Sequence, residues 1–308
     1  MSVKRLCGLF GKSRQHYYKL VITIRKKLVM QSKVLQLVDA VRAEHPRIGT
    51  RKLHHMLAPI LAQIGLSIGR DRLFQLLDDH GLLLRMRTKS GPKTTDPSLW
   101  GGQYPDLLYA HHGLPEKANG WVCDITYVRT KKGFVFLALI TDIRSRKIIG
   151  HHTSESMETA KLCLPALQMA IKQTPAHQLE GTIHHSDRGK QYLEKQYCNL
   201  LKSLGMHISM TQRGNPRDNA IAERVNGILK NEYLFQELVD LKAAARAITK
   251  SKELYNTKRP HTSLGFKTPQ EVWLENQKSD IFTLPKNTGD KQGSCKPSTR
   301  IMTLACQK

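Results

Sequence analysis

The chain has 308 residues, 40% of them hydrophobic and 6% aromatic, so it can bury an ordinary core and form roughly two domains. Its 49 Lys and Arg residues outnumber 25 Asp and Glu residues, and the formal charge of +24 favours a polyanionic partner. No stretch approaches the roughly 18 uninterrupted apolar residues of a membrane-spanning helix, and the basic start lacks the apolar core of a secretory signal. The composition therefore excludes a membrane protein and favours one that binds nucleic acid.

The cysteines and histidines give no metal-binding pattern. Six cysteines are scattered without a Cys-x-x-Cys pair, which argues against a disulfide framework and fits a reducing cytoplasm. Four histidine doublets begin at residues 54, 111, 151 and 184, and no cysteine pair accompanies them. Zinc ligation is one interpretation of these doublets, but solvated or buried core histidines are the interpretation we favour.

Composition and periodicity divide the chain into four parts. Residues 1–88 are basic and helical, without strand-like alternation, and residues 89–108 form a linker rich in Gly, Pro, Ser and Thr. Residues 109–280 alternate between strand and helix patterns and form the core with its C-terminal helices. Residues 281–308 carry basic and small polar residues without periodicity, which predicts a disordered tail.

Two helix-turn-helix patterns are predicted in the first part. The first joins a helix at 3–10 to a second helix that Ser13 caps. The second joins helices at 50–62 and 70–80, and a separate helix at about 34–43 precedes it.

Three arginines of these helices are candidate DNA contacts. Arg14 follows the cap of the first pattern, and Arg70 and Arg72 begin the last helix of the second. In such motifs the second helix reads a groove or clamps phosphates. The alternative is a helical subdomain with a solvated basic face, and the charge of the chain favours DNA contact.

The core alternates strands and helices in an order that predicts an α/β fold. The first three strands are joined by short turns and form an antiparallel meander. The complete order predicts a mixed sheet of five strands that helices flank. The expected strands are 120–129, 133–142, 147–153, 182–185 and 207–210, and the expected helices are 157–173, 191–204, 219–233 and 240–255.

Three acids on separate elements are the candidate catalytic residues. Asp124 lies in the middle of the first strand, Asp187 ends the fourth strand, and Glu223 lies in the first turns of a helix. Magnesium prefers a few carboxylates together with water and phosphate oxygens, and two such ions can catalyse phosphodiester cleavage. Asp142, which also ends an apolar strand, is the rival of Asp124, and its other interpretation is a side-chain acceptor within the following turn.

Basic and amide residues near the third acid are candidate phosphate contacts. Lys230 lies seven residues after Glu223 and therefore on the same helix face two turns later. Asn215, Arg217 and Asn219 precede that helix, and Asn219 is also its expected N-cap.

Several motifs surround these acids in a fixed order. In chain order, the motifs are WVCDITY at 121–127, LALITDIRSR at 137–146, IHHSDRGKQY at 183–192, RGNPRDNAIAE at 213–223 and YNTKRPHTSLG at 255–265. Together they resemble the catalytic core of insertion-sequence transposases related to retroviral integrases. The group is the one whose transposase is split between two overlapping reading frames, and the chain looks like the second-frame (orfB) catalytic subunit over nearly all of residues 1–275.

The resemblance implies a ribonuclease H-like core with a metal-binding DDE triad. In the family, residues that match Asp124, Asp187 and Glu223 bind Mg²⁺, for which Mn²⁺ can substitute, and Lys230 matches the associated basic residue. The implied reaction cuts a DNA strand to expose a 3′-hydroxyl and joins that hydroxyl to another strand, without a covalent protein intermediate. Nothing matches the His-His-Cys-Cys zinc module of retroviral integrases.

The resemblance also implies partners. We expect DNA, as terminal inverted repeats and target, a homo-oligomer on that DNA, an upstream-frame helix-turn-helix protein, and a bacterial cytoplasmic location at the nucleoid. Two alternatives remain at this point: a catalytically inactive DNA-binding regulator, and a ribonuclease H-like nuclease without strand transfer.

Overall fold

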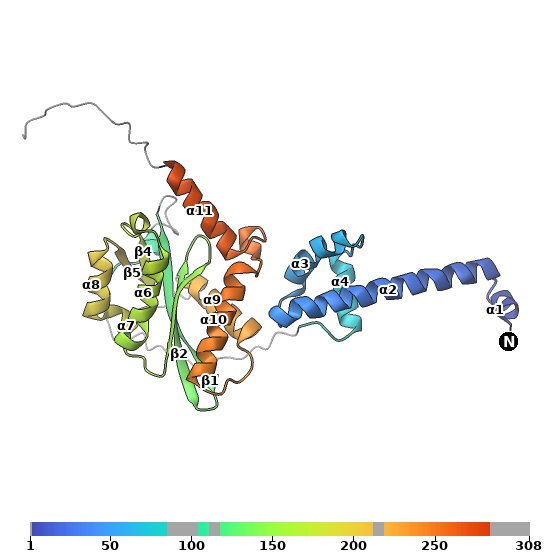
Figure 1. Cartoon of the computed structure of the whole chain (residues 1–308), viewed down its shortest axis with the longest axis horizontal. Helices are drawn as coiled ribbons and strands as arrows, with labels where there is room; N and C mark the ends of the chain where they lie inside the picture. The colour runs from blue at the N-terminus through green and yellow to red at the C-terminus, as the bar shows by residue number, and fades with distance from the viewer. Residues whose placement is uncertain (1, 85–103, 111–117, 212–218, 284–308) are drawn as a thin grey trace, which may run out of the picture.

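The computed structural model of the chain describes residues 2–84, 104–110, 118–211 and 219–283. An amino-terminal group of helices, α1 to α4, lies beside a five-stranded sheet that other helices cover (Figure 1). The expected mixed α/β fold with an all-helical region before it is therefore confirmed. The helices are α1 (Val3–Leu9), α2 (Arg14–Glu44), α3 (Thr50–Gln63), α4 (Arg70–Asp79), α5 (Leu107–Ala110), α6 (Cys163–Gln173), α7 (Lys190–Leu193), α8 (Lys195–Ser203), α9 (Ala220–Ile228), α10 (Leu241–Thr257) and α11 (Pro269–Thr283).

The sheet has the strand order β3-β2-β1-β4-β5. Its first three strands pair antiparallel, as the two short turns between them require, and β4 and β5 run parallel to β1. The five strands are β1 (Gly120–Thr130), β2 (Gly133–Asp142), β3 (Ile148–Ser154), β4 (Ile183–Ser186) and β5 (His207–Met210). All five expected strands are present, with ends within one residue of the expectation.

Alternate residues of β1 pack into different layers on the two faces of the sheet. Trp121 and Cys123 belong to a core that α6 and α8 complete. Val128 belongs to a second core with residues of α9 and α10, and Val122 packs with Ala222 of α9. Because side chains alternate along a strand, Asp124 shares the face that α9 covers.

The helix α6 lies unusually close to the edge strand β3. A Cβ atom on Gly150 would lie 2.3 Å from the carbonyl oxygen of Ala166, so only glycine permits this approach. The expected helix at 157–173 is shorter in the structure, where a 3₁₀ turn (Thr159–Lys161) precedes α6. Pro165 lies in the first turn of α6, where its missing N–H removes no intrahelical hydrogen bond, so a start at Cys163 accommodates it.

The amino-terminal helices have a core of their own, in which Val34 and Val38 of α2 pack on leucines of α3 and α4. The separate helix expected at 34–43 is wrong, since α2 is one helix of 31 residues. No Gly or Pro interrupts its sequence, so nothing breaks it between the Ser13 cap and Glu44. The Ser13 cap itself is confirmed, because its hydroxyl accepts from the His16 amide at 3.1 Å.

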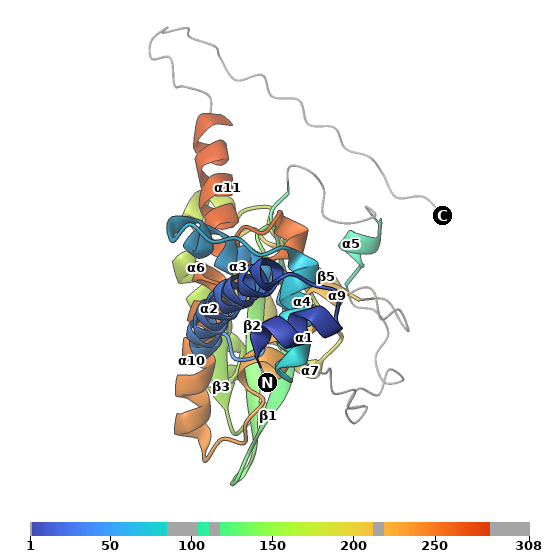
Figure 2. The same cartoon turned by 90° about the vertical axis from the view of Figure 1, so that its right-hand side faces the viewer.

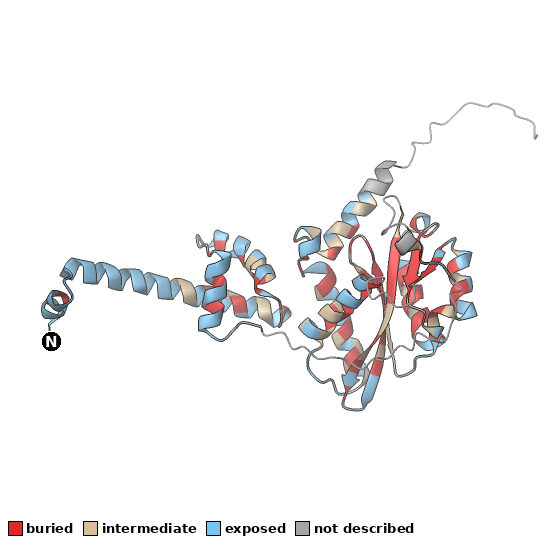
Figure 3. Cartoon of the chain, turned by 180° about the vertical axis from the view of Figure 1, so that it is seen from behind, coloured by how far each residue is buried: buried red, intermediate tan, exposed pale blue. Residues whose placement is uncertain are grey.

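The amino-terminal half of α2 extends away from the rest of the chain. Residues 14–29 are exposed throughout, including apolar side chains such as Ile22, Leu28 and Val29 (Figure 3). Figure 1 shows the helical region on the side of α9 and α10, away from α7 and α8, and in Figure 2, which is viewed from that side, it lies in front of the sheet. Within the described ranges, no helix is long and apolar enough to cross a membrane.

The end of the expected linker belongs to the core. Asp106 is buried, the Met210 amide donates to the carbonyl of Pro105, and the Leu107 amide donates to Ser209 Oγ. At the other end, α11 runs to Thr283 and so includes the first three residues, 281–283, of the expected tail.

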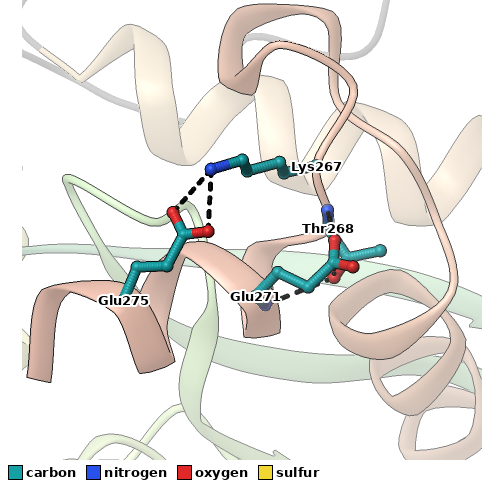
Figure 4. A network of polar contacts seen from close by, with 4 residues as sticks. All are labelled: Lys267, Thr268, Glu271 and Glu275. Atoms are coloured by element: carbon teal, nitrogen blue, oxygen red, sulfur yellow. Dashed lines mark hydrogen bonds and ion pairs between the residues drawn. The ribbon is translucent and has the colours of Figure 1, made fainter. Parts of the chain in front are cut away.

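Reciprocal hydrogen bonds define the start of α11. The Glu271 carboxylate accepts from the Thr268 amide at 2.6 Å, and the Glu271 amide donates to the Thr268 hydroxyl at 3.3 Å, which makes a capping box (Figure 4). Lys267 adds an ion pair to Glu275 one turn further on. Local sequence therefore fixes where this helix begins.

Candidate active site

The strand register brings Asp124 and Asp187 side by side. In the parallel pair, Trp121 lies opposite His184 and Val122 opposite His185. Asp124 lies two residues after Val122 on β1, and Asp187 lies two residues after His185, just beyond the end of β4. The electrostatic interaction between the two carboxyls agrees with this geometry, since Asp187 raises the pKa of Asp124.

The two histidines before Asp187 hold β4 in place. His184 is buried, with Nε2 3.0 Å from Cys123 Sγ and 2.9 Å from the Tyr197 hydroxyl, and its burial lowers its pKa to about 3. His185 Nδ1 lies 2.8 Å from Ser209 Oγ on β5. The interpretation of this doublet as core histidines is confirmed.

A tight turn fixes the Asp187 carboxylate. Its Oδ1 accepts a hydrogen bond from the Gly189 amide at 3.0 Å. A Cβ atom on residue 189 would lie 2.9 Å from the same oxygen, so the turn requires glycine. Burial raises the pKa of Asp187, and the Gly189 amide lowers it.

The helix α9 brings Glu223 to the same edge of the sheet. Asn219 precedes α9, and its side-chain amide donates to the Cys123 carbonyl at 3.1 Å, next to Asp124. Asn219 occupies the N-cap position, but its side chain makes no capping hydrogen bond, so the expected capping bond is wrong. The amide binds the strand instead. Glu223 is exposed in the first turn of α9 and raises the pKa of Asp124.

Asn226 contacts Asp124 directly and was missed from the sequence. Its side-chain amide donates to Asp124 Oδ2 at 2.5 Å, one helical turn after Glu223. The only sequence signal was its position three residues after Glu223, on the same helix face. Lys230 follows, half-buried, with Nζ 4.5 Å from the centre of the Tyr127 ring and close enough to Asp124 to interact electrostatically.

The acids form an electrostatically unfavourable group without a cation. The pKa of Asp124 rises to about 7, mainly through burial, then through Asp187 and, more weakly, Glu223. A divalent cation would relieve this repulsion, and carboxylates are the ligands that Mg²⁺ prefers. Across the described part of the chain, no three His, Cys, Asp or Glu side chains approach closely enough to hold one ion as they stand. The donor chemistry fits a metal, with side-chain adjustment needed to complete the site.

Asp142, the other candidate for the first acid, has a structural role: its side chain accepts hydrogen bonds within the following turn. It is buried at the end of β2, and its Oδ1 accepts from both the amide and the hydroxyl of Ser145, at 2.7 and 2.5 Å. Burial raises its pKa, and the Ser145 bonds lower it. Its carboxylate is therefore committed to the turn before β3.

The candidate DNA contacts lie in different surroundings. Arg14, Arg70 and Arg72 are exposed on α2 and α4, and Arg70 Nε pairs with Asp71 at 2.8 Å. They lie in the helical region and not among the acids. Asn219 is buried beside the first acid, and Asn215 and Arg217 lie outside the described residues.

Comparisons with known proteins identify the family of the chain. Two models described as integrase core domain match residues 115–216 and 204–269. The 31 kDa protein of insertion element IS600 from Shigella sonnei is 34% identical over 274 residues, which cover 86% of this chain and 96% of that protein. The transposase of IS904 from Lactococcus lactis is 37% identical over 49% of this chain and 59% of its own length.

Solved structures with a similar fold are more distant. The HTLV-2 integrase catalytic core in complex with magnesium is 19% identical with a TM-score of 0.40, covering 56% of this chain and 99% of that one. The BIV integrase catalytic core is 22% identical, also with a TM-score of 0.40, and covers 53% and 97%.

Proposed function

The chain belongs to the insertion-sequence transposases of the DDE/integrase superfamily, and we propose that Asp124, Asp187 and Glu223 are its catalytic triad. The observation that supports this proposal is the parallel register of β1 and β4, because each of the first two acids follows the paired residues Val122 and His185 by two positions and their carboxyls interact electrostatically. Glu223 and Asn226 of α9, and Lys230 in the turn that follows it, all interact with Asp124.

The proposed reaction is Mg²⁺-dependent cleavage and strand transfer. Water first attacks the phosphorus at the element's end, and the bond from that phosphorus to the 3′-oxygen breaks. The element strand is left with a 3′-hydroxyl and the flanking strand with a 5′-phosphate. That hydroxyl then attacks a phosphorus of the target strand, forms a new phosphodiester bond and releases a 3′-hydroxyl there. Mg²⁺, or Mn²⁺ in its place, bound by the three carboxylates would stabilise the attacking and leaving oxygens.

The side chains of the site have separate tasks in this scheme. Asn226 donates to Oδ2 of Asp124 and would hold this carboxylate in place to bind an ion. Lys230 carries a positive charge beside Asp124, where it would bind a phosphate of the incoming DNA. The exposed Arg14, Arg70 and Arg72 of the helical region would bind DNA outside the site, and Asn215 and Arg217 are further proposed DNA contacts.

The partners follow from the same reaction. Joining two element ends needs two sites, so we propose a homo-oligomer on terminal-repeat and target DNA, in the bacterial cytoplasm at the nucleoid. An upstream-frame helix-turn-helix protein would add recognition of the ends.

A strand-joining assay tests the proposal. The wild-type chain with Mg²⁺ and element-end DNA should give joined products, and Asp187→Asn and Glu223→Gln should give none while still binding DNA. Asp142→Asn is a matched control, because it removes the charge of a neighbouring buried acid outside the site. Cleavage without joining would identify a nuclease, and tight binding without cleavage would identify an inactive regulator.

A further inference from the structure

The turn that follows α9 contacts three parts of the molecule. Residues Leu229–Tyr233 form a π-helical turn, η3, closed by a hydrogen bond from the Leu234 amide to the Leu229 carbonyl at 2.9 Å. Single π-turns in helices often mark functional positions, because the extra residue changes the direction of the side chains that follow. Within η3, Lys230 interacts electrostatically with Asp124 of the candidate active site. Glu232 and Tyr233 contact Arg259 and His45, which are far away in the sequence.

Glu232 forms a buried ion pair with Arg259. Arg259 Nε donates to Oε2 at 2.7 Å and Nη2 donates to Oε1 at 2.6 Å, so the pair is bidentate. The Arg259 side chain is only 2% exposed and that of Glu232 15%. A buried pair seldom stabilises a fold more than apolar packing does, but it sets direction and distance strictly.

Arg259 is itself held by the sheet through its own segment. Its Nη1 lies 3.1 Å from His261 Nε2, and three residues earlier Asn256 bonds both the amide and the carbonyl of Ile148, each at 2.9 Å. The motif at 255–265 therefore anchors the end of α10 to the edge strand β3. Through Glu232, that anchor extends to η3.

The helical region reaches the next residue of the same turn. His45, at the end of α2, is 1% exposed, and its Nδ1 lies 2.8 Å from the Tyr233 hydroxyl. Arg47 lies over the ring of Phe235, 5.5 Å from its centre. The end of the long helix is thus packed onto the turn that carries Lys230.

We propose that Arg259 and His45 are positioning residues for strand transfer, acting through Glu232 and Tyr233 to hold Lys230 beside Asp124. The inference rests on the proposed function and adds to it a link between the helical region and the active site. A displaced η3 would move the Lys230 ammonium from the phosphate that it binds, and small displacements of such groups reduce rates strongly.

A double-mutant cycle tests the link. Arg259→Lys keeps the charge but not the bidentate geometry, and we expect joining of bound DNA to slow about tenfold with the dissociation constant for DNA unchanged. In a Lys230→Ala background the same substitution should have little further effect, because its effect passes through Lys230. Multiplicative losses in the double variant, or no loss in Arg259→Lys alone, would overturn the inference.

A second variant keeps the test valid if Arg259→Lys does not fold. Tyr233→Phe removes only the hydroxyl that meets His45, and we expect joining to slow about threefold, again only while Lys230 is present. Equal effects with and without Lys230 would contradict the link.

The control lies next to the anchor. Lys258→Ala removes an exposed ion pair with Glu44 and should join at the wild-type rate. If the wild-type chain joins no DNA, the proposed function fails and this inference with it. If the wild-type chain joins DNA but the losses multiply, the inference alone fails.

Discussion

Two acids on paired strands, Asp124 of β1 and Asp142 of β2, have opposite roles in this fold. Both residues belong to strands of the sheet, and burial raises the pKa of both carboxyls. Asp142 Oδ1 is bonded by the amide and hydroxyl of Ser145, three residues away. Asp124 contacts Asn226, 102 residues away, and interacts with another acid, Asp187, on the adjacent strand.

The difference lies in what the neighbours supply. Local donors compensate the buried charge of Asp142, so its carboxylate is part of a turn. The acids near Asp124 add charge of the same sign, and its surroundings therefore favour a bound cation. Both residues are aspartates on strands of one sheet, and their neighbours separate the structural acid from the proposed catalytic one.

The largest expected effect comes from Asp124→Asn. The substitution keeps size and the contact to Asn226 but removes the charge, so we expect joining to fall by about a thousandfold or more. Without Mg²⁺, the free energy of unfolding at neutral pH should be at least that of the wild type, because the raised pKa of Asp124 means that its buried charge destabilises the folded state. Gel-based joining assays and urea denaturation measure the two quantities, and joining at even a tenth of the wild-type rate would contradict the assignment.

Asp142→Ala should lower the stability of the fold and leave strand joining intact. It leaves the amide and hydroxyl of buried Ser145 without their acceptor, which we expect to reduce the free energy of unfolding by about 2 kcal/mol. Joining per folded molecule should be retained. Ser145→Ala is the comparison variant: the Ser145 amide keeps its acceptor, but the hydroxyl that donates to Asp142 and accepts from the Lys147 amide is removed, so we expect a loss of about 1 to 2 kcal/mol. A loss of joining in folded Asp142→Ala would break the comparison.

The effect of added Mg²⁺ on the free energy of unfolding should distinguish Asp124 from Asp142. An ion that binds only the native state at ten times its dissociation constant stabilises it by about 1.4 kcal/mol. Thermal unfolding should show this increase for the wild type and for Asp142→Asn, and none for Asp124→Asn. An equal increase in all three proteins would indicate that the ion binds elsewhere.

The smallest effect is the pH dependence of Asp142→Asn. The folded pKa of Asp142 lies above its unfolded value, so the folded state binds more protons and the wild type loses stability as pH rises through that window. Asn cannot ionise and keeps the oxygen that accepts from Ser145. Its stability relative to the wild type should therefore increase as pH rises above about 4, by at most about 1.4 kcal/mol for each pH unit. Urea unfolding between pH 4 and 7 measures this difference, and a constant difference would contradict the raised pKa.

Much of the core could be predicted from sequence because its signals are local. Alternation of apolar and polar residues gave all five strands, and Ser13 gave the start of α2. The helix expected at 34–43 failed because periodicity identifies buried segments, and the outer half of α2 is helical without being buried. The π-turn at Leu229–Tyr233 was also out of reach, since long-range contacts to Arg259 and His45 accompany it.

The sequence by itself indicated the candidate acids, their separate elements and the family, because its motifs and their order can be recognised without knowledge of contacts. Only the tertiary structure decided the structural role of Asp142, the contact of Asn226 with Asp124 and the use of Asn219 as a strand contact. Each depends on which partner lies within hydrogen-bonding distance, and those partners are supplied by strands and helices brought together in folding. A carboxylate's function is set by the charges and donors around it, and these are properties of the packed chain.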